Sequence, residues 1–288
     1  MIILLLCITV NVVLAVLFKV FPRYGIRNYP AIVVNYMAAV LMGSLISGRL
    51  IINTQPFGES WFPYAVALSV LFIIGFNILA MSFQLFGISM TTIYQKMSIL
   101  ISALFGIIVY HETSNLWKLF GLLLAVVAII LVNFNVKSSN EKVIKLKLSL
   151  YIYPFLSFLL SGIIEVILLI VGVEGIVTNS IEFVSNSFAM AAIWGLIILA
   201  VSFRPVITAK EVLAGVILGI PNFFTIYLLT VLIDQGWEGS VLFPINSIGV
   251  LLLSALVAIL IFREKVDTYK IIGLVAALGS ILLIGMGI

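Results

Sequence analysis

The stretch TIYQKMSILISALFGIIVYHETSNLWKLFGLLLAVVAIILVNFN, from Thr92 to Asn135, decides the fold because the chain repeats its pattern near the C-terminus. The second copy is PINSIGVLLLSALVAILIFREKVDTYKIIGLVAALGSILLIGMG, from Pro244 to Gly287. Each copy has an apolar helix that ends on an acidic residue, a short polar joint, and a second apolar helix opened by Lys-x-x-Gly. A constant offset of 152 residues superimposes Ser102 on Ser254, Glu112 on Glu264, Lys118 on Lys270, Gly121 on Gly273 and Ala125 on Ala277. Such self-similarity indicates an internal duplication.

The composition indicates a membrane protein. Of the 288 residues, 64% are hydrophobic and 9% are charged, whereas a soluble domain carries about 25% charged residues. A water-soluble core cannot hide so much apolar surface, so we predict an integral membrane protein. The net charge is +4, but the basic residues sit in short joints and form no patch that would suit a nucleic acid.

A helix needs about 20 apolar residues to cross a bilayer. Continuously apolar stretches predict helices, whereas membrane strands would alternate apolar and polar residues. We therefore predict an all-α polytopic membrane protein with ten transmembrane helices. The ten stretches are 2–20, 30–48, 62–86, 90–110, 117–135, 149–173, 181–203, 212–233, 240–262 and 269–287.

The lysine-rich joint at 137–147 divides the chain into two repeats, 1–136 and 148–288, with five predicted helices each. The same offset also places Ala39 on Ala191 and Gly43 on Gly195 in the second helix of each repeat. An odd number of helices forces the two repeats into opposite orientations. This inverted-repeat plan is typical of secondary transporters, whose site lies near the midplane between the halves.

Lysine and arginine counts predict the orientation. Twelve lie in the joints after the first, third, fifth, seventh and ninth helices, and two, Arg49 and Lys118, lie in the opposite joints. The excess marks the cytoplasmic side, so we expect an inner (plasma) membrane protein of a bacterium with both termini outside. The twelve are Lys19, Arg23, Arg27, Lys137, Lys142, Lys145, Lys147, Arg204, Lys210, Arg263, Lys265 and Lys270.

Small residues one helical turn apart predict close helix packing, although such residues are also common in membrane helices in general. The pairs are Ser102 with Gly106, Ser254 with Ala258, Gly121 with Ala125, and Gly273 with Ala277. Glu112 and Glu264 end their helices near the interface, where charge costs little, and we interpret them as structural residues of the joints.

The duplicated pattern of Glu112 and Glu264, each followed by Lys-x-x-Gly and a last apolar helix, resembles the drug/metabolite transporter superfamily, EamA type. Asn35-Tyr36, Lys96-Met97-Ser98 and Phe243-Pro-Ile-Asn246 resemble a bacterial branch of it that is uncharacterised. The resemblance implies a ten-helix bundle whose first, third, fourth, sixth, eighth and ninth helices line a cavity, with the fifth and tenth at the periphery. It also implies export or exchange of small metabolites by alternating access. Members are commonly drawn with cytoplasmic termini, and here the charge bias predicts the reverse.

Two ionisable side chains fall inside predicted helices, where a charge costs about 2.5–3.5 kcal/mol at the bilayer centre. Lys96 would bind an anionic group, and Glu165 would bind a cationic group or a coupling proton. Burial disfavours the charged form of both, so either could exchange a proton near neutral pH. The alternatives are a structural Lys96–Glu165 pair, or a lysine that extends to the interface. Lys96 also resembles the substrate lysine of sugar-phosphate and nucleotide-sugar members, but the ninth helix offers Asn246 in place of a second lysine.

Uncharged polar residues complete the predicted lining. Amides in lipid need partners and should face the bundle, where each is as well suited to bonding a neighbouring helix as to a ligand. The substrate-binding candidates are Lys96, Glu165, Asn11, Asn77, Gln95, Asn222, Tyr227 and Asn246. Asn35, Tyr36, Gln84, Tyr94 and Asn186 are further polar residues of the predicted helices.

The leading interpretation is a secondary active transporter of small polar metabolites, such as amino acids or related compounds, with protons as a candidate coupling ion. The first alternative is a passive facilitator or channel, and the second is a membrane-embedded lipid-handling enzyme. We expect no enzyme, because no cluster of catalytic groups is seen, and no ATP-binding loop is present. We expect no cofactor, no metal and no nucleic acid. The expected partners are a small-molecule substrate and the lipid bilayer, and a monomer suffices.

Overall fold

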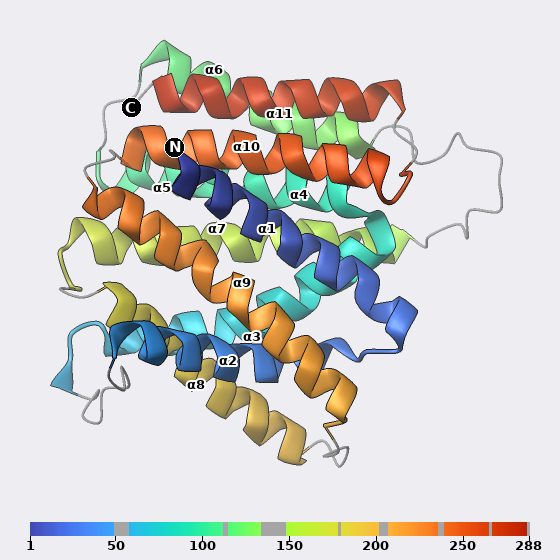
Figure 1. Cartoon of the computed structure of the whole chain (residues 1–288). Coiled ribbons are helices and arrows are strands. Elements are labelled where there is room, and N and C mark those ends of the chain that lie inside the picture. The colour runs from blue at the N-terminus through green and yellow to red at the C-terminus, as the bar shows by residue number, and fades with distance from the viewer. Residues whose placement is uncertain are drawn as a thin grey trace. The chain divides into compact units, whose positions relative to one another are not determined.

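A computed structural model describes residues 1–48, 58–111, 115–133, 148–177, 180–201, 207–235, 239–264 and 267–286. A helix occupies each of the ten predicted stretches, and no strand occurs in the described residues (Figure 1). The helices are α1 (Ile2–Val20), α2 (Asn28–Ser47), α3 (Phe62–Phe86), α4 (Ile88–Lys96), α5 (Ile99–Val109), α6 (Leu116–Asn133), α7 (Ile152–Val173), α8 (Ser180–Val201), α9 (Ala209–Asp234), α10 (Gly239–Leu260) and α11 (Thr268–Met286), with the short 3₁₀ helices η1 (Phe21–Tyr24) and η3 (Leu148–Tyr151).

Eight helical segments in the described residues are long and apolar enough to cross a membrane. Two shorter apolar segments, Leu116–Leu131 and Ile245–Leu260, lie within α6 and α10. The outer face of α6 shows what these segments expose, because Phe120, Leu123 and Val127 are exposed while Ala125 and Ala128 are buried. Bulky apolar side chains on the outside suit contact with lipid, as expected of an integral membrane protein.

The predicted helix at 90–110 differs from the observed structure. It is broken into α4 and α5, with a turn at Met97 and Ser98 between them. The stretch contains no proline and no glycine at the break, so its residues give no local reason for an interruption. Ser98, a residue of this turn, bonds to a distant helix, as described below.

The helices group into two compact units, and each unit takes segments from both halves of the sequence. Unit 1 comprises Met1–Ala80 and Ile167–Gln235, and unit 2 comprises Met81–Val166 and Gly236–Ile288. The predicted division into 1–136 and 148–288 describes a sequence repeat, which this grouping does not test. The lysine-rich joint at 137–147 lies outside the described residues.

In unit 1, α2 packs against both α8 and α9, and α1 packs against α9. Two glycines of α9 allow the close approach to α2. A Cβ on Gly215 would lie 2.6 Å from the backbone oxygen of Ala31, and one on Gly219 would lie 2.6 Å from Ala38 Cβ. Gly215 and Gly219 are one helical turn apart, so they form a small-residue face of the kind that lets helix backbones meet in lipid.

An aromatic cluster fills the core of unit 1 around Tyr36. The ring of Tyr36 is fully buried, stacks on Phe72 and Phe188, and packs against Phe76. Its hydroxyl donates a hydrogen bond to the backbone oxygen of Phe72 at 2.7 Å. Of the two roles left open for the polar residues of the helices, contact with neighbouring helices is the one seen for Tyr36, because its ring and hydroxyl are both occupied by the core.

In unit 2, α6 and α11 pack along their lengths (Figure 1), and α10 packs against both α4 and α11. Gly121 is the closest point of the α6–α11 contact. A Cβ there would meet the backbone nitrogen of Ile284 at 2.9 Å, and Ser280 Oγ donates to the Gly121 oxygen at 2.7 Å. The expected packing role of Gly121 is thus seen directly.

Candidate functional site

The interruption between α4 and α5 is the most unusual feature of the helices in unit 2. The backbone amides of Ser98, Leu100 and Ile101 donate to carbonyls three residues earlier, those of Gln95, Met97 and Ser98. A straight α-helix would use carbonyls four residues earlier. A tightened turn of this kind in the middle of a long helix often marks a hinge. Lys96, a predicted site residue, is the last residue of α4 before this turn.

Glu165 of α7 faces the interruption. Its carboxyl lies 2.6 Å from Ser98 Oγ through Oε1 and 3.0 Å from Ser102 Oγ through Oε2. Ser98 and Ser102 are four residues apart and so lie on one face of the chain across the turn. Glu165 therefore bonds a residue of the turn itself and a residue of the first turn of α5.

A glycine brings α7 close enough for these bonds. A Cβ on Gly162 would lie 2.7 Å from Ile101 Cβ, well inside any normal carbon–carbon contact. Gly162 and Glu165 are three residues apart on α7, and Ile101 lies between Ser98 and Ser102. The glycine and the carboxyl therefore act on the same short segment of α5.

Lys96 and Gln95 contribute differently to this site. Both are half-buried at the end of α4, and the charge of Lys96 acts on Glu165 through space. The backbone oxygen of Gln95 lies 2.6 Å from Ser98 Oγ. Of the predicted residues, Lys96, Gln95 and Glu165 are therefore brought together, by way of a serine that the prediction left out.

Asn246 is the remaining predicted residue of unit 2. It is buried in α10, the helix that packs against α4, and its Oδ1 atom has no hydrogen-bond partner among the described residues. A buried polar atom without a partner costs about 1–3 kcal/mol. Such an atom calls for an explanation, and a water or a polar ligand would satisfy it.

Unit 1 holds the other four predicted residues, and two of them bond to their own helix. Asn11 donates from Nδ2 to the Cys7 oxygen at 2.9 Å, and Asn77 donates from Nδ2 to the Ile73 oxygen at 2.8 Å. These bonds satisfy the amide nitrogens without a neighbouring helix or a ligand. A neighbouring helix and a ligand were the partners considered for the amides from the sequence, and the carbonyl one turn back, which is within reach in any helix, was left out.

Asn222 keeps an open donor. It is buried in α9, and its Nδ2 atom has no hydrogen-bond partner in the part of the chain that the structure describes. On α2, the helix that α9 packs against, Asn35 is fully buried, and neither its Nδ2 nor its Oδ1 atom is bonded to a described residue. Unit 1 therefore has its own unsatisfied amides, as unit 2 has in Asn246.

Tyr227 lies on α9 beside a small hollow. Its ring stacks on Phe223 with centroids 5.5 Å apart and meets the edge of Phe224. The hollow is almost wholly apolar, and its other lining residues are Ile181, Val184, Ser185 and Ile226. The neighbours of Tyr227 would suit an apolar group better than a charged one.

Two acidic residues position the starts of helices, and their contacts were not predicted from the sequence. Glu264 accepts hydrogen bonds from the first amides of α4, with Oε1 2.7 Å from Ile88 N and Oε2 3.4 Å from Ser89 N. A carboxylate suits this place because the N-terminus of a helix carries a partial positive charge. We expected Glu264 to be structural, and its partners prove to be these backbone amides. Glu112 lies outside the described residues.

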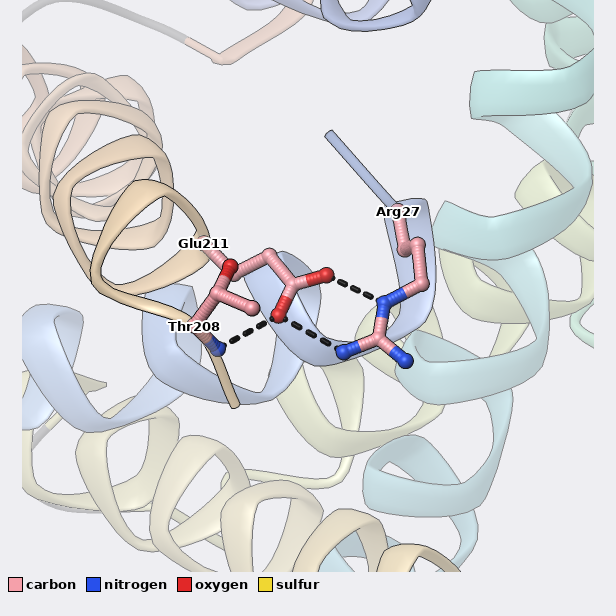
Figure 2. A network of polar contacts seen from close by, with 3 residues as sticks. All are labelled: Arg27, Thr208 and Glu211. Carbon is pink, nitrogen blue, oxygen red and sulfur yellow. Dashed lines mark hydrogen bonds and ion pairs between the residues drawn. The ribbon is translucent and has the colours of Figure 1, made fainter. Parts of the chain in front are cut away.

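The second is Glu211, which joins the start of α9 to the start of α2 (Figure 2). Arg27 contacts its carboxylate with both Nε and Nη2, the latter at 2.9 Å. The Thr208 amide donates to Glu211 Oε2 at 2.8 Å, and the Glu211 amide donates to the Thr208 oxygen at 2.9 Å. Thr208-x-x-Glu211 has the spacing of a helix capping box. This spacing could have predicted the cap at the start of α9 from the sequence.

The sequence signal for Ser98 and Ser102 was their spacing. Two hydroxyls four residues apart lie one helical turn apart, and they follow a lysine in an otherwise apolar stretch. Ser102 was assigned to helix packing instead. Among the described residues, no group of three His, Cys, Asp or Glu side chains could hold a metal ion.

No protein-family model matches the chain. An uncharacterised protein of Haemophilus influenzae is 24% identical over 286 residues, which cover 96% of this chain and 95% of that protein. One protein of known crystal structure aligns over 96% of both chains with a TM-score of 0.58 and 14% sequence identity. This likeness shows a shared fold over nearly the whole length, and the fold alone.

Proposed function

We propose that the protein is a secondary active transporter of small polar metabolites, such as amino acids or related compounds, that works by alternating access. The observation that carries the proposal is the interrupted helix α4–α5, with Lys96 at the break and Glu165 bonded across it. Transporters commonly build substrate and ion sites at discontinuous helices, where backbone groups and buried charges meet. An ionisable residue inside a membrane helix is costly and is by default a functional candidate.

The arrangement of the repeat supports the proposal. The offset of 152 residues relates α2 to α8, α4 to α10, and α6 to α11. The two members of each pair pack against each other. Contact between equivalent helices is what an approximate two-fold relation between inverted repeats would produce. The resemblance to EamA-type members of the drug/metabolite transporter superfamily points the same way.

In this proposal the ammonium group of Lys96 attracts an anionic group of the substrate, such as a carboxylate. The unsatisfied Oδ1 atom of Asn246, on the helix α10 that packs against α4, is a polar group that a substrate or its water could bond. The movement that exposes the site to either side would use the turn at Met97 and Ser98.

The test is transport by the purified protein in liposomes loaded with a pooled metabolite panel, followed by mass spectrometry of both compartments. We expect flux of at least one polar metabolite in the wild type and at least a tenfold loss in Lys96→Ala. Lys210→Ala is the matched control, because Lys210 is exposed at the start of α9, and it should transport normally.

Two results would contradict the proposal. One is an absence of flux for every metabolite in the wild type, with and without ion gradients. The other is a Lys96→Ala protein that transports as fast as the wild type. Flux that runs only downhill and never follows an imposed gradient would instead favour the passive facilitator.

A further inference from the structure

The hydroxyl of Ser98 lies close to two acceptors. Its Oγ atom is 2.6 Å from the Gln95 backbone oxygen and 2.6 Å from Glu165 Oε1. Both separations are at the short end of the range for O–H···O hydrogen bonds, and an oxygen–oxygen contact this short has a hydrogen between the two atoms. A serine hydroxyl has only one hydrogen to give. One of the two contacts therefore needs a hydrogen from elsewhere.

Ser102 does not supply it. Its Oγ atom lies 3.0 Å from Glu165 Oε2 and 3.2 Å from the Ile99 backbone oxygen, so its own hydrogen serves one of those two longer contacts. The backbone oxygen of Gln95 has no hydrogen to offer. The remaining source within the cluster is the Glu165 carboxyl itself, in its protonated form.

We propose that Glu165 is a proton-binding site and that this conformation holds the proton. The Glu165 O–H group donates to Ser98 Oγ, Ser98 donates to the Gln95 oxygen, and Ser102 donates to the other carboxyl oxygen. Three hydrogens then serve both contacts of Ser98 and the carboxyl contact of Ser102. Each of these contacts then has its hydrogen, and the half-buried carboxyl carries no charge.

Release of the proton rearranges the hinge. The Glu165 O–H bond breaks, the proton passes to a water molecule as hydronium, and a carboxylate remains. The hydrogen of Ser98 then turns from the Gln95 oxygen to the carboxylate, because a charged acceptor forms the stronger bond. The Gln95 oxygen loses that bond at the turn between α4 and α5. Protonation is thereby linked to the bonding of the residue next to Lys96.

Lys96 ends α4 beside the turn and is the charged residue nearest to Ser98 in the sequence, and a positive charge near a carboxyl favours release of its proton. The described residues of α5 and α10 carry no ionisable side chain. The other ionisable residues on the described helices of unit 2 are Tyr94 on α4, Lys118 on α6, Tyr151 on η3, Tyr153 on α7, and Tyr269 and Lys270 on α11. An anionic substrate at Lys96 would weaken its pull on Glu165 and so favour protonation.

The proton site extends the proposed transport function. Only the role of the proton in coupling rests on that function. Proton binding itself can be tested without any substrate. We would record infrared difference spectra of the full-length protein in lipid vesicles while the buffer is switched between neutral and alkaline pH. The wild type should lose a protonated-carboxyl C=O band on alkalinisation, and Glu165→Gln should lack that band.

Two variants make the assignment specific. Glu174→Gln removes an exposed carboxylate at the end of the same segment, and it should leave the band unchanged. Ser98→Ala removes the acceptor of the carboxyl hydrogen, so the band should persist but shift to higher frequency, as a carboxyl does when its hydrogen bond is lost. Glutamine can donate to Ser98 and accept from Ser102, so Glu165→Gln should fold. If it does not, Ser98→Ala carries the test alone.

A wild type without a protonated-carboxyl band at neutral pH would overturn the proposal. So would a band that Ser98→Ala leaves at its original frequency. The two proposals can fail independently. If the infrared band behaves as expected but the protein transports no metabolite, the proton site is supported and the proposed transport function is contradicted. If transport is seen, Glu165→Gln should abolish its response to a pH gradient.

Discussion

Gly87 and Glu264 meet so closely that the Glu264 carboxylate occupies the space where a Cβ of residue 87 would lie. Gly87 joins α3 to α4 with φ +87, a conformation that L-amino acids with side chains rarely adopt. The carboxylate uses the vacant space to reach the first amides of α4. One glycine therefore provides both the sharp turn and the access for the cap.

Gly87→Ala should lower stability more than the same substitution does at another glycine with positive φ. Strained backbone of this kind costs about 1–3 kcal/mol, and here the new methyl group would also push the Glu264 carboxylate away from Ile88 N. Thermal unfolding of the purified protein in detergent measures the loss. Gly25→Ala is the matched control, because Gly25 has φ +65 with nothing within 4 Å of its Cβ position. Equal losses in the two variants would show that the Glu264 contact contributes nothing.

The Arg27–Glu211 pair should behave as one unit in a double-mutant cycle. The Glu211 side chain is 2% exposed and that of Arg27 is 47% exposed, so removal of Arg27 leaves a buried carboxylate short of its partner. We expect Glu211→Ala to lower the unfolding temperature more than Arg27→Ala, because it also removes the helix cap. The double variant should lose clearly less than the sum. Additive losses would mean that the two residues stabilise the fold independently.

This pair should add no alkaline pH dependence. Hydrogen bonding to Glu211 raises the pKa of Arg27 above its ordinary value. A raised pKa in the folded state gives stability that persists until the pH passes the unfolded value. The unfolding temperatures of wild type and Arg27→Ala should therefore differ by a constant amount from neutral to mildly alkaline pH. A difference that shrinks within that range would implicate another group.

Gly162→Ala should damage the proton site without touching a polar atom. The new Cβ would lie 2.7 Å from Ile101 Cβ, so α7 must move away from α5 and the bonds from Glu165 to Ser98 and Ser102 must lengthen. Overpacking of this size costs about 1–3 kcal/mol, and the infrared band of Glu165 should shift.

Gly172→Ala is the control on the same helix, because nothing lies within 4 Å of its Cβ position. Removing that glycine should be neutral or should stabilise α7 by up to about 1 kcal/mol. If both alanine variants keep the wild-type band and unfolding temperature, the close approach of α7 to α5 plays no part in the site.

The helices were predictable because each corresponds to a long apolar stretch of the sequence, and α1 and α3 begin and end where expected. The break between α4 and α5 was not, because Lys96-Met97-Ser98-Ile99 contains no helix breaker and the turn is bonded to Glu165, 67 residues beyond Ser98. Tyr36 could not be assigned to the core, because α2 is apolar on all sides and its sequence does not tell which side faces inward. Glu211 and Arg27 are 184 residues apart, with no local pattern that relates them.

Lys96 and Glu165 were singled out for a different reason. Charge inside a membrane segment is rare enough to stand out in a single sequence. What the sequence could not supply was the set of neighbours, because a serine hydroxyl in an apolar helix is an ordinary residue until its partner is known. The sequence repeat predicted which helices are equivalent, whereas the contacts between them could be seen only in the structure.

The interleaving of the two units has a consequence for biogenesis. Unit 1 cannot close until Gln235 has been made, since α8 and α9 supply the surfaces that cover α2. During synthesis, α1 to α3 therefore wait in the membrane beside lipid or the insertion machinery, with the amide of Asn35 and the small residues Ala31 and Ala38 uncovered. The contacts that bury Asn35, Ala31 and Ala38 can therefore form only late in synthesis.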